Sequence, residues 1–137
     1  MIICKKLHFD AAHRILNHES KCKMLHGHRY VLEVQIKGQG LDDLGRVIDF
    51  GQVTNILGKW VEENLDHNTI LFNQDRQLGE QISKATGQEI YYLNSNPTAE
   101  NIALHIKNDI FPKLFAGHDL QCHQIKLFET PNCYTIC

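Results

Sequence analysis

Two histidines separated by one glycine, His26 and His28, open the clearest strand pattern in the sequence. From Tyr30 onward, apolar and polar residues alternate, which is typical of a strand with one buried face. Side chains two residues apart in a strand point the same way, so both imidazoles project from one face about 7 Å apart. An unpartnered polar ring beside an apolar interior is costly, and a bound metal ion would remove that cost. The alternative is a turn with hydrogen-bonded histidines.

A third histidine favours the metal site. The stretch from Ile3 to His13 alternates in the same way, and His13 ends it on the apolar face. Three histidines with an open fourth position are typical of a catalytic zinc site rather than a structural one. We therefore expect Zn²⁺ to be the cofactor, with His13, His26 and His28 as its ligands.

Cys22 lies four residues before His26, between Lys21 and Lys23. Nearby positive charge or a metal favours the thiolate, which suits a base or a nucleophile. Two alternatives remain open for this residue: an ordinary loop position, or a further zinc ligand.

Asp66 and His67 follow the last apolar residue of a helical pattern. A carboxylate can orient an imidazole, and the imidazole can then activate a thiol. The alternative is an ordinary turn at the end of a helix.

Glu129 follows Ile125 and Leu127 at two-residue intervals, so its carboxylate is expected on the same apolar face of the strand. Such a group is either paired or waits for a ligand with adjacent N–H donors, such as an aminopyrimidinone ring. The alternative is a strand-end residue that faces water.

The elements expected to position these residues form an α+β domain spanning residues 1–137. Four strands are expected near 3–13, 26–37, 124–129 and 133–137. One long helix should begin after the capping residue Asp49, and a second after Asn96, with Pro97 in its first position. Residues 78–85 suggest a further short helix. This order predicts a four-stranded antiparallel sheet with two long helices on one face.

Composition excludes several classes of protein. The 137 residues are 42% hydrophobic and 22% charged, which excludes disordered and collagen-like chains. A net charge of −2 argues against a nucleic-acid partner, and no apolar run is long enough to span a membrane. The start MIICKKLHFD is unlike a signal peptide, so we expect a cytoplasmic protein. Five cysteines without a CxxC spacing indicate reduced thiols.

Six segments, taken in order, resemble the 6-pyruvoyl tetrahydropterin synthase superfamily: FDAAHR, CKMLHGH, VIDFG, LDH, NPTAEN and ETP. The resemblance covers nearly the whole chain. It implies His13, His26 and His28 as zinc ligands, with Cys22, Asp66 and His67 as a catalytic trio. It also implies Glu129 as the anchor of the pterin, with Thr98 and Glu100 nearby.

The spacing Cys-x3-His-Gly-His resembles the carboxy-forming branch of that superfamily, which serves queuosine biosynthesis. Two features depart from it: the segment between LDH and NPTAEN is long, and Cys133 and Cys137 stand in the tail where other residues are expected. The implied fold is the tunnelling fold, in which the sheets of several subunits close into a barrel. The implied partners are further copies of the chain, in a hexamer of two stacked trimers with active sites between subunits.

The implied substrate is 7,8-dihydroneopterin triphosphate, a small molecule whose triphosphate Arg14 or lysines would meet. The implied products are 6-carboxy-5,6,7,8-tetrahydropterin, acetaldehyde and triphosphate. The alternatives are a 6-pyruvoyl-forming synthase, which stops after triphosphate elimination, and a non-catalytic zinc- or pterin-binding protein.

Overall fold

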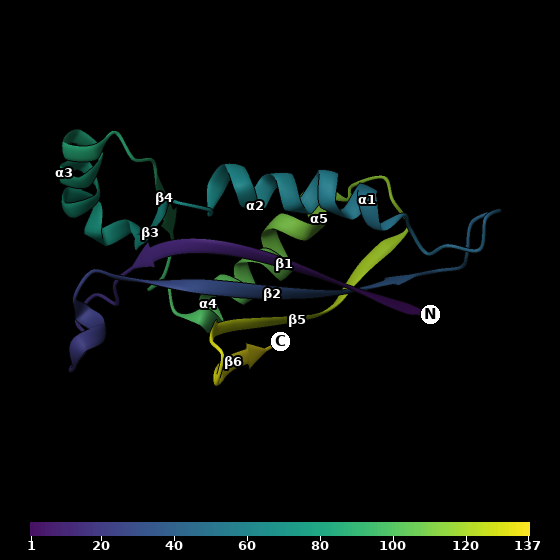
Figure 1. Cartoon of the computed structure of the whole chain (residues 1–137), viewed down its shortest axis with the longest axis horizontal. Coiled ribbons are helices and arrows are strands. Elements are labelled where there is room, and N and C mark those ends of the chain that lie inside the picture. Colours follow the sequence, from purple (N-terminus) through teal and green to yellow (C-terminus); the bar gives the residue numbers. More distant parts are fainter.

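Two long antiparallel strands form the centre of the sheet in a computed structural model that describes residues 1–137. β1 (Ile2–His13) pairs with β2 (His26–Gly38) so that Ile2 lies opposite Lys37 and His13 opposite His26 (Figure 1). β5 (Leu120–Thr130) pairs with β2, and β6 (Cys133–Ile136) pairs with β5, both antiparallel. The four expected strands and their antiparallel pairing are therefore confirmed.

The sheet has six strands rather than the four that the sequence predicts. β3 (Thr69–Phe72) runs parallel to the last two residues of β1, and β4 (Ile90–Leu93) runs parallel to β3. The strand order is β4-β3-β1-β2-β5-β6. Three of the four β3 residues are buried, so this strand carries no apolar–polar alternation that would reveal it in the sequence.

Both long helices are present and pack over the sheet (Figure 1). The first runs from α1 (Phe50–Val53) through the π-helical segment η2 (Thr54–Gly58) into α2 (Lys59–Asn64). As expected, the Asp49 carboxylate caps it, accepting the backbone N–H of Gly51 at 2.7 Å. The second runs from α4 (Ala99–His105) through η4 (Ile106–Ile110) into α5 (Phe111–Leu114).

The cap of the second helix differs from the expected one. Thr98, not Asn96, is the N-cap, and its hydroxyl accepts the backbone N–H of Asn101 at 3.3 Å. The Asn96 amide instead bonds the backbone N–H and C=O of Leu16 at 2.7 and 3.1 Å. Asn96 therefore ties the loop after β1 to the start of this helix.

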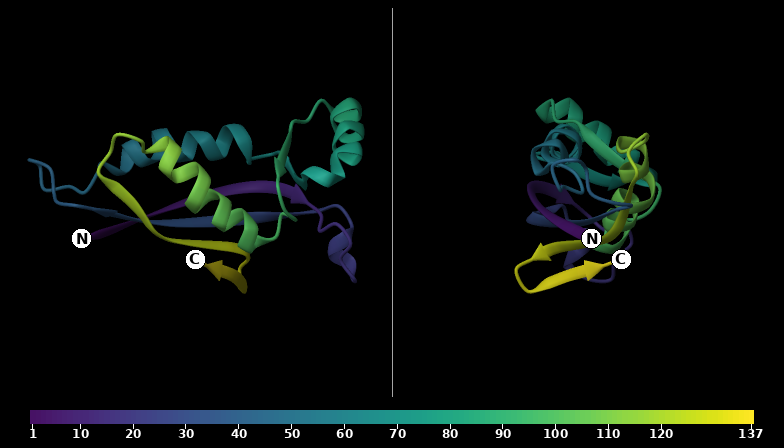
Figure 2. Two further views of the ribbon diagram at one scale, coloured as in Figure 1. Left: turned by 180° about the vertical axis from the view of Figure 1, so that it is seen from behind. Right: turned by 90° about the vertical axis from the view of Figure 1, so that its right-hand side faces the viewer.

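The expected short helix is also present as α3 (Arg76–Thr86), preceded by η3 (Asn73–Asp75). Gly87 ends it in the left-handed conformation at φ 74°, which glycine adopts without strain. α3 lies at the same end of the molecule as η1 (Lys21–Lys23), the single helical turn between β1 and β2 (Figure 2). Two segments that are irregular in sequence thus flank the end of β1 where His13 stands.

The core lies between the two long helices and the face of the sheet that they cover. That face contributes apolar residues from β1, β2 and β5: Phe9, Ala11, Tyr30, Leu32, Val34, Ile36, Ile125 and Leu127. No helix in the structure is both long and apolar enough to cross a membrane. All five cysteines are free thiols.

Candidate active site

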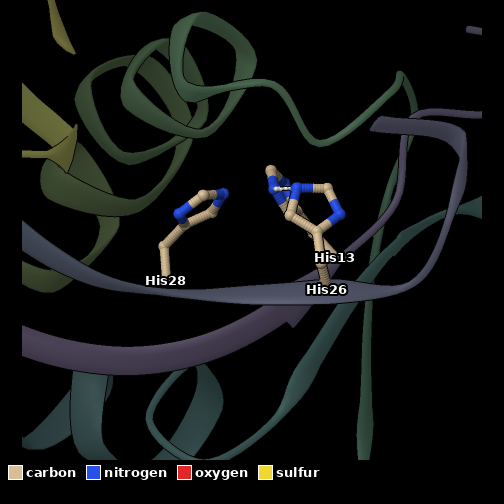
Figure 3. Close-up of side chains that lie close together, drawn as sticks. All are labelled: His13, His26 and His28. Atoms are coloured by element: carbon tan, nitrogen blue, oxygen red, sulfur yellow. Dashed lines mark hydrogen bonds between the residues drawn. The ribbon is translucent and has the colours of Figure 1, made fainter. Parts of the chain in front are cut away.

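The three predicted histidines converge at one end of the helix-covered face. One ring nitrogen from each of His13, His26 and His28 lies within 4.8 Å of the other two. His13 ends β1 directly opposite His26 at the start of β2, and His28 follows on the same face of β2. All three rings point to one side of the sheet (Figure 3). The alternation read from the sequence therefore places these side chains together.

The hydrogen bonds of two of these rings fix their tautomers. Nδ1 of His13 lies 2.7 Å from the backbone oxygen of Pro97, and Nδ1 of His26 lies 2.7 Å from that of Met24. A carbonyl oxygen only accepts, so both Nδ1 atoms carry the proton. The Tyr30 hydroxyl, 3.1 Å from Nδ1 of His13, is the weaker partner. Both Nε2 atoms are then unprotonated in the neutral rings, and they face each other at 3.2 Å.

Two facing lone pairs need a cation or a proton between them. Burial lowers the pKa of His13 to about 4, an effect that the neighbouring His26 and His28 strengthen. Burial also lowers the pKa of His28, with Glu129 opposing. Protonation near pH 7 is therefore disfavoured, whereas a divalent cation fits. Metal-binding histidines typically donate their second ring N–H to a carbonyl or carboxylate, as His13 and His26 do here.

Glu129 lies beside this cluster. Its Oε1 is 3.6 Å from Nε2 of His13 and 3.9 Å from Nε2 of His28, and its side chain is 30% exposed. Glu129 lies on the apolar face of β5 as expected, because Ile125 and Leu127 are fully buried on the same face. The carboxylate thus borders both the histidines and an open space.

That space is a pocket of about 230 Å³ that collects four of the predicted site residues. Cys22 from η1 lines it together with Thr98 and Glu100 at the start of α4 and Glu129 at the end of β5. These residues come from three distant parts of the sequence. These four residues bring a thiol, two carboxylates and a hydroxyl to a pocket next to the histidine cluster.

Asp66 and His67 form the expected dyad, but away from this pocket. Nδ1 of His67 lies 2.7 Å from Oδ2 of Asp66, and the imidazole is 80% exposed. His67 borders a separate hollow with Asp10, Ala12 and Arg29, which alternate with the core-facing residues of β1 and β2. Within one chain, the dyad therefore lies toward the uncovered face of the sheet and apart from Cys22, although His28 of the histidine cluster also lines the hollow that His67 borders.

Arg14 is already engaged by another residue and is not free to meet a triphosphate. Its guanidinium makes a two-point ion pair with the buried carboxylate of Asp75, with Nη2 at 2.6 Å from Oδ1. This pair joins the end of β1 to η3. The expectation that Arg14 contacts the triphosphate is therefore not supported by its geometry.

Further residues line the Cys22 pocket to which the sequence assigns no role in the site, among them His18, Cys133 and Thr135. His18 accepts the backbone N–H of Ser20 at Nδ1, and Cys133 and Thr135 come from β6. Cys133 and Thr135 point to the same face of the sheet as Leu127, which pairs with Thr135. Their two-residue spacing in a strand is the sequence feature that could have revealed them.

Comparison with known proteins agrees with the six motifs. The family model described as 6-pyruvoyl tetrahydropterin synthase matches residues 2–137. A relative from Rickettsia felis named 6-carboxy-5,6,7,8-tetrahydropterin synthase is 54% identical over 135 residues, covering 98% of each chain. A Haemophilus influenzae protein of the same name is 31% identical over 138 residues, covering 96% of this chain and 94% of its own.

Solved structures share the fold. A protein from Wolinella succinogenes described as uncharacterized matches with a TM-score of 0.82 at 19% identity, over 100% of this chain and 97% of its own. The 6-pyruvoyl tetrahydropterin synthase of Plasmodium falciparum matches with a TM-score of 0.71 at 19% identity, over 100% and 96%. The resemblance inferred from the motifs is thus confirmed. The chain belongs to the 6-pyruvoyl tetrahydropterin synthase family and is an enzyme with a pterin synthase role.

Proposed function

We propose that this enzyme is zinc-dependent and converts 7,8-dihydroneopterin triphosphate into 6-carboxy-5,6,7,8-tetrahydropterin, releasing acetaldehyde and triphosphate. In this proposal His13, His26 and His28 hold Zn²⁺ through their Nε2 or other free ring nitrogens. The product is the one named for the relatives at 54% and 31% identity. Residues 1–137 act as one domain with a role in queuosine biosynthesis in the cytoplasm.

One observation carries this proposal: the Glu129 carboxylate borders both the histidine cluster and the pocket that contains Cys22. A pterin whose ring N–H groups bond Glu129 would extend its side chain between Cys22 and the three histidines. Thr98 and Glu100 line the same pocket and would contact the ring or its substituents. In this proposal the arrangement would bring a ring anchor, a base and a cation site to one small molecule.

The roles of the side chains follow from their chemistry. A bound zinc ion would act as a Lewis acid toward the hydroxyl oxygens of the substrate side chain, making the adjacent C–H more acidic. Cys22 as thiolate removes that proton. Asp66 holds the tautomer of His67 with the proton on Nδ1, so that Nε2 accepts and returns protons in the later steps.

The separation of Cys22 from Asp66 and His67 within one chain supports a site formed between copies. The edge of β1 from Ile2 to Ala11 has no strand partner, since β3 pairs only with Ala12 and His13. β6, a strand of four residues, forms the other edge of the antiparallel part. Joining such edges would close sheets into a barrel and remove exposed backbone groups. We propose a hexamer of two stacked trimers in which a neighbouring copy brings its Asp66 and His67 to Cys22.

The test is product analysis by mass after incubation with dihydroneopterin triphosphate, using metal-free and zinc-loaded protein. We expect acetaldehyde and the 6-carboxy product only with zinc. His26→Ala should lose most bound zinc and the activity, whereas His123→Ala, a histidine outside the cluster, should keep both. Formation of the pyruvoyl product without acetaldehyde would contradict the proposed reaction, and full zinc occupancy in His26→Ala would contradict the ligand set.

A further inference from the structure

We propose that Gln88 is a positioning residue that holds His67 in the orientation needed for proton transfer. This inference rests on the role of Asp66 and His67 proposed above. It arises from the segment between β3 and β4, which the sequence marks as long and to which the motifs assign no role.

His67 stands in an unusual backbone conformation. Its φ is 58°, and it is one of only two non-glycine residues with positive φ in the structure. A β-carbon makes this region unfavourable, so the surroundings must hold the residue there. The backbone N–H of His67 donates to the carbonyl of Asp10 at 2.6 Å, which fixes one side of the peptide. The other side is fixed by Gln88.

The amide of Gln88 bridges His67 and the buried start of β3. Its Nε2 donates to the carbonyl oxygen of His67 at 2.7 Å, and its Oε1 accepts the hydroxyl of Thr69 at 2.6 Å. The His67 carbonyl cannot donate, so the amide nitrogen must face it and the amide oxygen must face Thr69. Thr69 is only 1% exposed, which holds the bridge at its inner end.

The fold brings Gln88 to this place through strand register. Thr69 of β3 lies opposite Ile90 of β4 in the parallel pair, so two residues earlier His67 and Gln88 are neighbours. The backbone of Gln88 is also fixed: its carbonyl accepts the Ser83 hydroxyl at 2.6 Å, and its N–H donates to the Thr86 hydroxyl at 3.1 Å. Through Gln88, α3 and β4 thus brace the dyad.

The imidazole itself is restrained only by Asp66, because its side chain is 80% exposed. The direction in which the imidazole points therefore depends on the backbone conformation of His67. Without the Gln88 amide, the strained conformation competes with ordinary ones while the rest of the fold persists. A misplacement of a reacting group by about 1 Å can lower activity by about 100-fold, so we expect a loss of about 10- to 100-fold.

Two near-isosteric variants of the zinc-loaded enzyme test the inference. Gln88→Met removes both amide bonds, whereas Gln88→Glu retains an acceptor for Thr69 but has no N–H for the His67 carbonyl. We expect both to lower kcat by about 10- to 100-fold, with unchanged KM and zinc content. The control Gln81→Ala changes an exposed glutamine of α3 and should leave all three values unchanged.

Each remaining outcome has a defined meaning. Normal kcat in Gln88→Glu would overturn the inference, because the donor to His67 would then be dispensable. A role through His67 also requires that adding Gln88→Met to His67→Ala cause little further loss. Full additivity would overturn it. Normal turnover of His67→Ala would instead remove the dyad from the proposed function, a failure that is seen without any Gln88 variant.

Discussion

At the scale of single residues, the site depends on atoms that no other protein group satisfies. The Nε2 atoms of His13 and His26 point at each other because their Nδ1 protons are held by the carbonyls of Pro97 and Met24. In water such lone pairs would be hydrated, but His13 is 1% exposed. The cluster could therefore hold a cation, and without one the stability of the fold should be sensitive to acid.

The acid sensitivity can be measured on metal-free protein. His13 has its pKa lowered to about 4, mainly by burial, so between about pH 6.5 and 4 the unfolded chain binds a proton that the folded chain does not. The free energy of unfolding should therefore fall by about 2 kcal/mol from pH 7 to 5, and His28 adds in the same direction. Urea unfolding at both pH values measures this, with His13→Gln as the control that loses the contribution. Equal stability at both pH values would contradict the assignment.

Glu129 has two possible partners, and a single substitution separates them. If the carboxylate anchors the pterin, Glu129→Gln should weaken substrate binding by about 1.5–3 kcal/mol, the size of a hydrogen bond to a charged group. It should leave zinc content unchanged, because in the proposed site three histidines would already supply the protein ligands. Equilibrium substrate binding and zinc analysis on the same preparation distinguish the two roles of Glu129. Loss of zinc with normal substrate affinity would make Glu129 a ligand instead.

At the scale of elements, the start of α4 connects helix capping to the histidine cluster. The carbonyl of Pro97 that binds His13 directly precedes the capping residue Thr98. Thr98→Ala should lower the free energy of unfolding by about 1 kcal/mol, as for other lost N-caps, and Thr98→Ser should retain it. Thermal unfolding without ligand measures the difference. A Thr98→Ala protein as stable as the parent would show that the cap contributes nothing.

Elements in which apolar residues recur at regular intervals could be predicted from the sequence, and elements without such a pattern could not. The alternation in β1 and β2 was enough to place His13, His26 and His28 on one face. The four buried or half-buried residues of β3 have no such pattern, and their partner β4 lies about twenty residues later, so the parallel pairs were missed. The cap was misassigned because Asn96 and Thr98 are both good capping residues two positions apart.

Residues that meet only through tertiary structure were beyond reach of spacing alone. Cys22, Thr98 and Glu129 share a pocket because a loop turn, a helix start and a strand end converge. His18 belongs to this pocket through the path of the loop after β1, which has no periodic signal. The six motifs added what spacing could not, since they implied that Cys22, Thr98 and Glu129 act in one site before any contact was visible.

At the scale of the whole molecule, one chain holds every group of the proposed site but not in one place. Cys22 lines the pocket beside the histidine cluster, whereas His67 borders a different hollow toward the uncovered face of the sheet. β1 has one edge without a strand partner from Ile2 to Ala11, and β6 is the edge strand on the other side. A ring of copies would use these edges and bring the two half-sites together.

This arrangement predicts complementation between two inactive proteins. Cys22→Ala should retain zinc and bind substrate yet lose turnover by about 10²- to 10⁴-fold, as expected for a missing base, and His67→Ala should also be slow with its metal in place. If each site takes Cys22 from one copy and His67 from a neighbour, unfolding and refolding the two variants together creates sites with both residues intact. In a random one-to-one mixture these are about a quarter of all sites, so about a quarter of wild-type activity should return. Mixing without subunit exchange is the control. Absence of recovery in co-assembled oligomers would place the whole trio within one chain and contradict the site between copies.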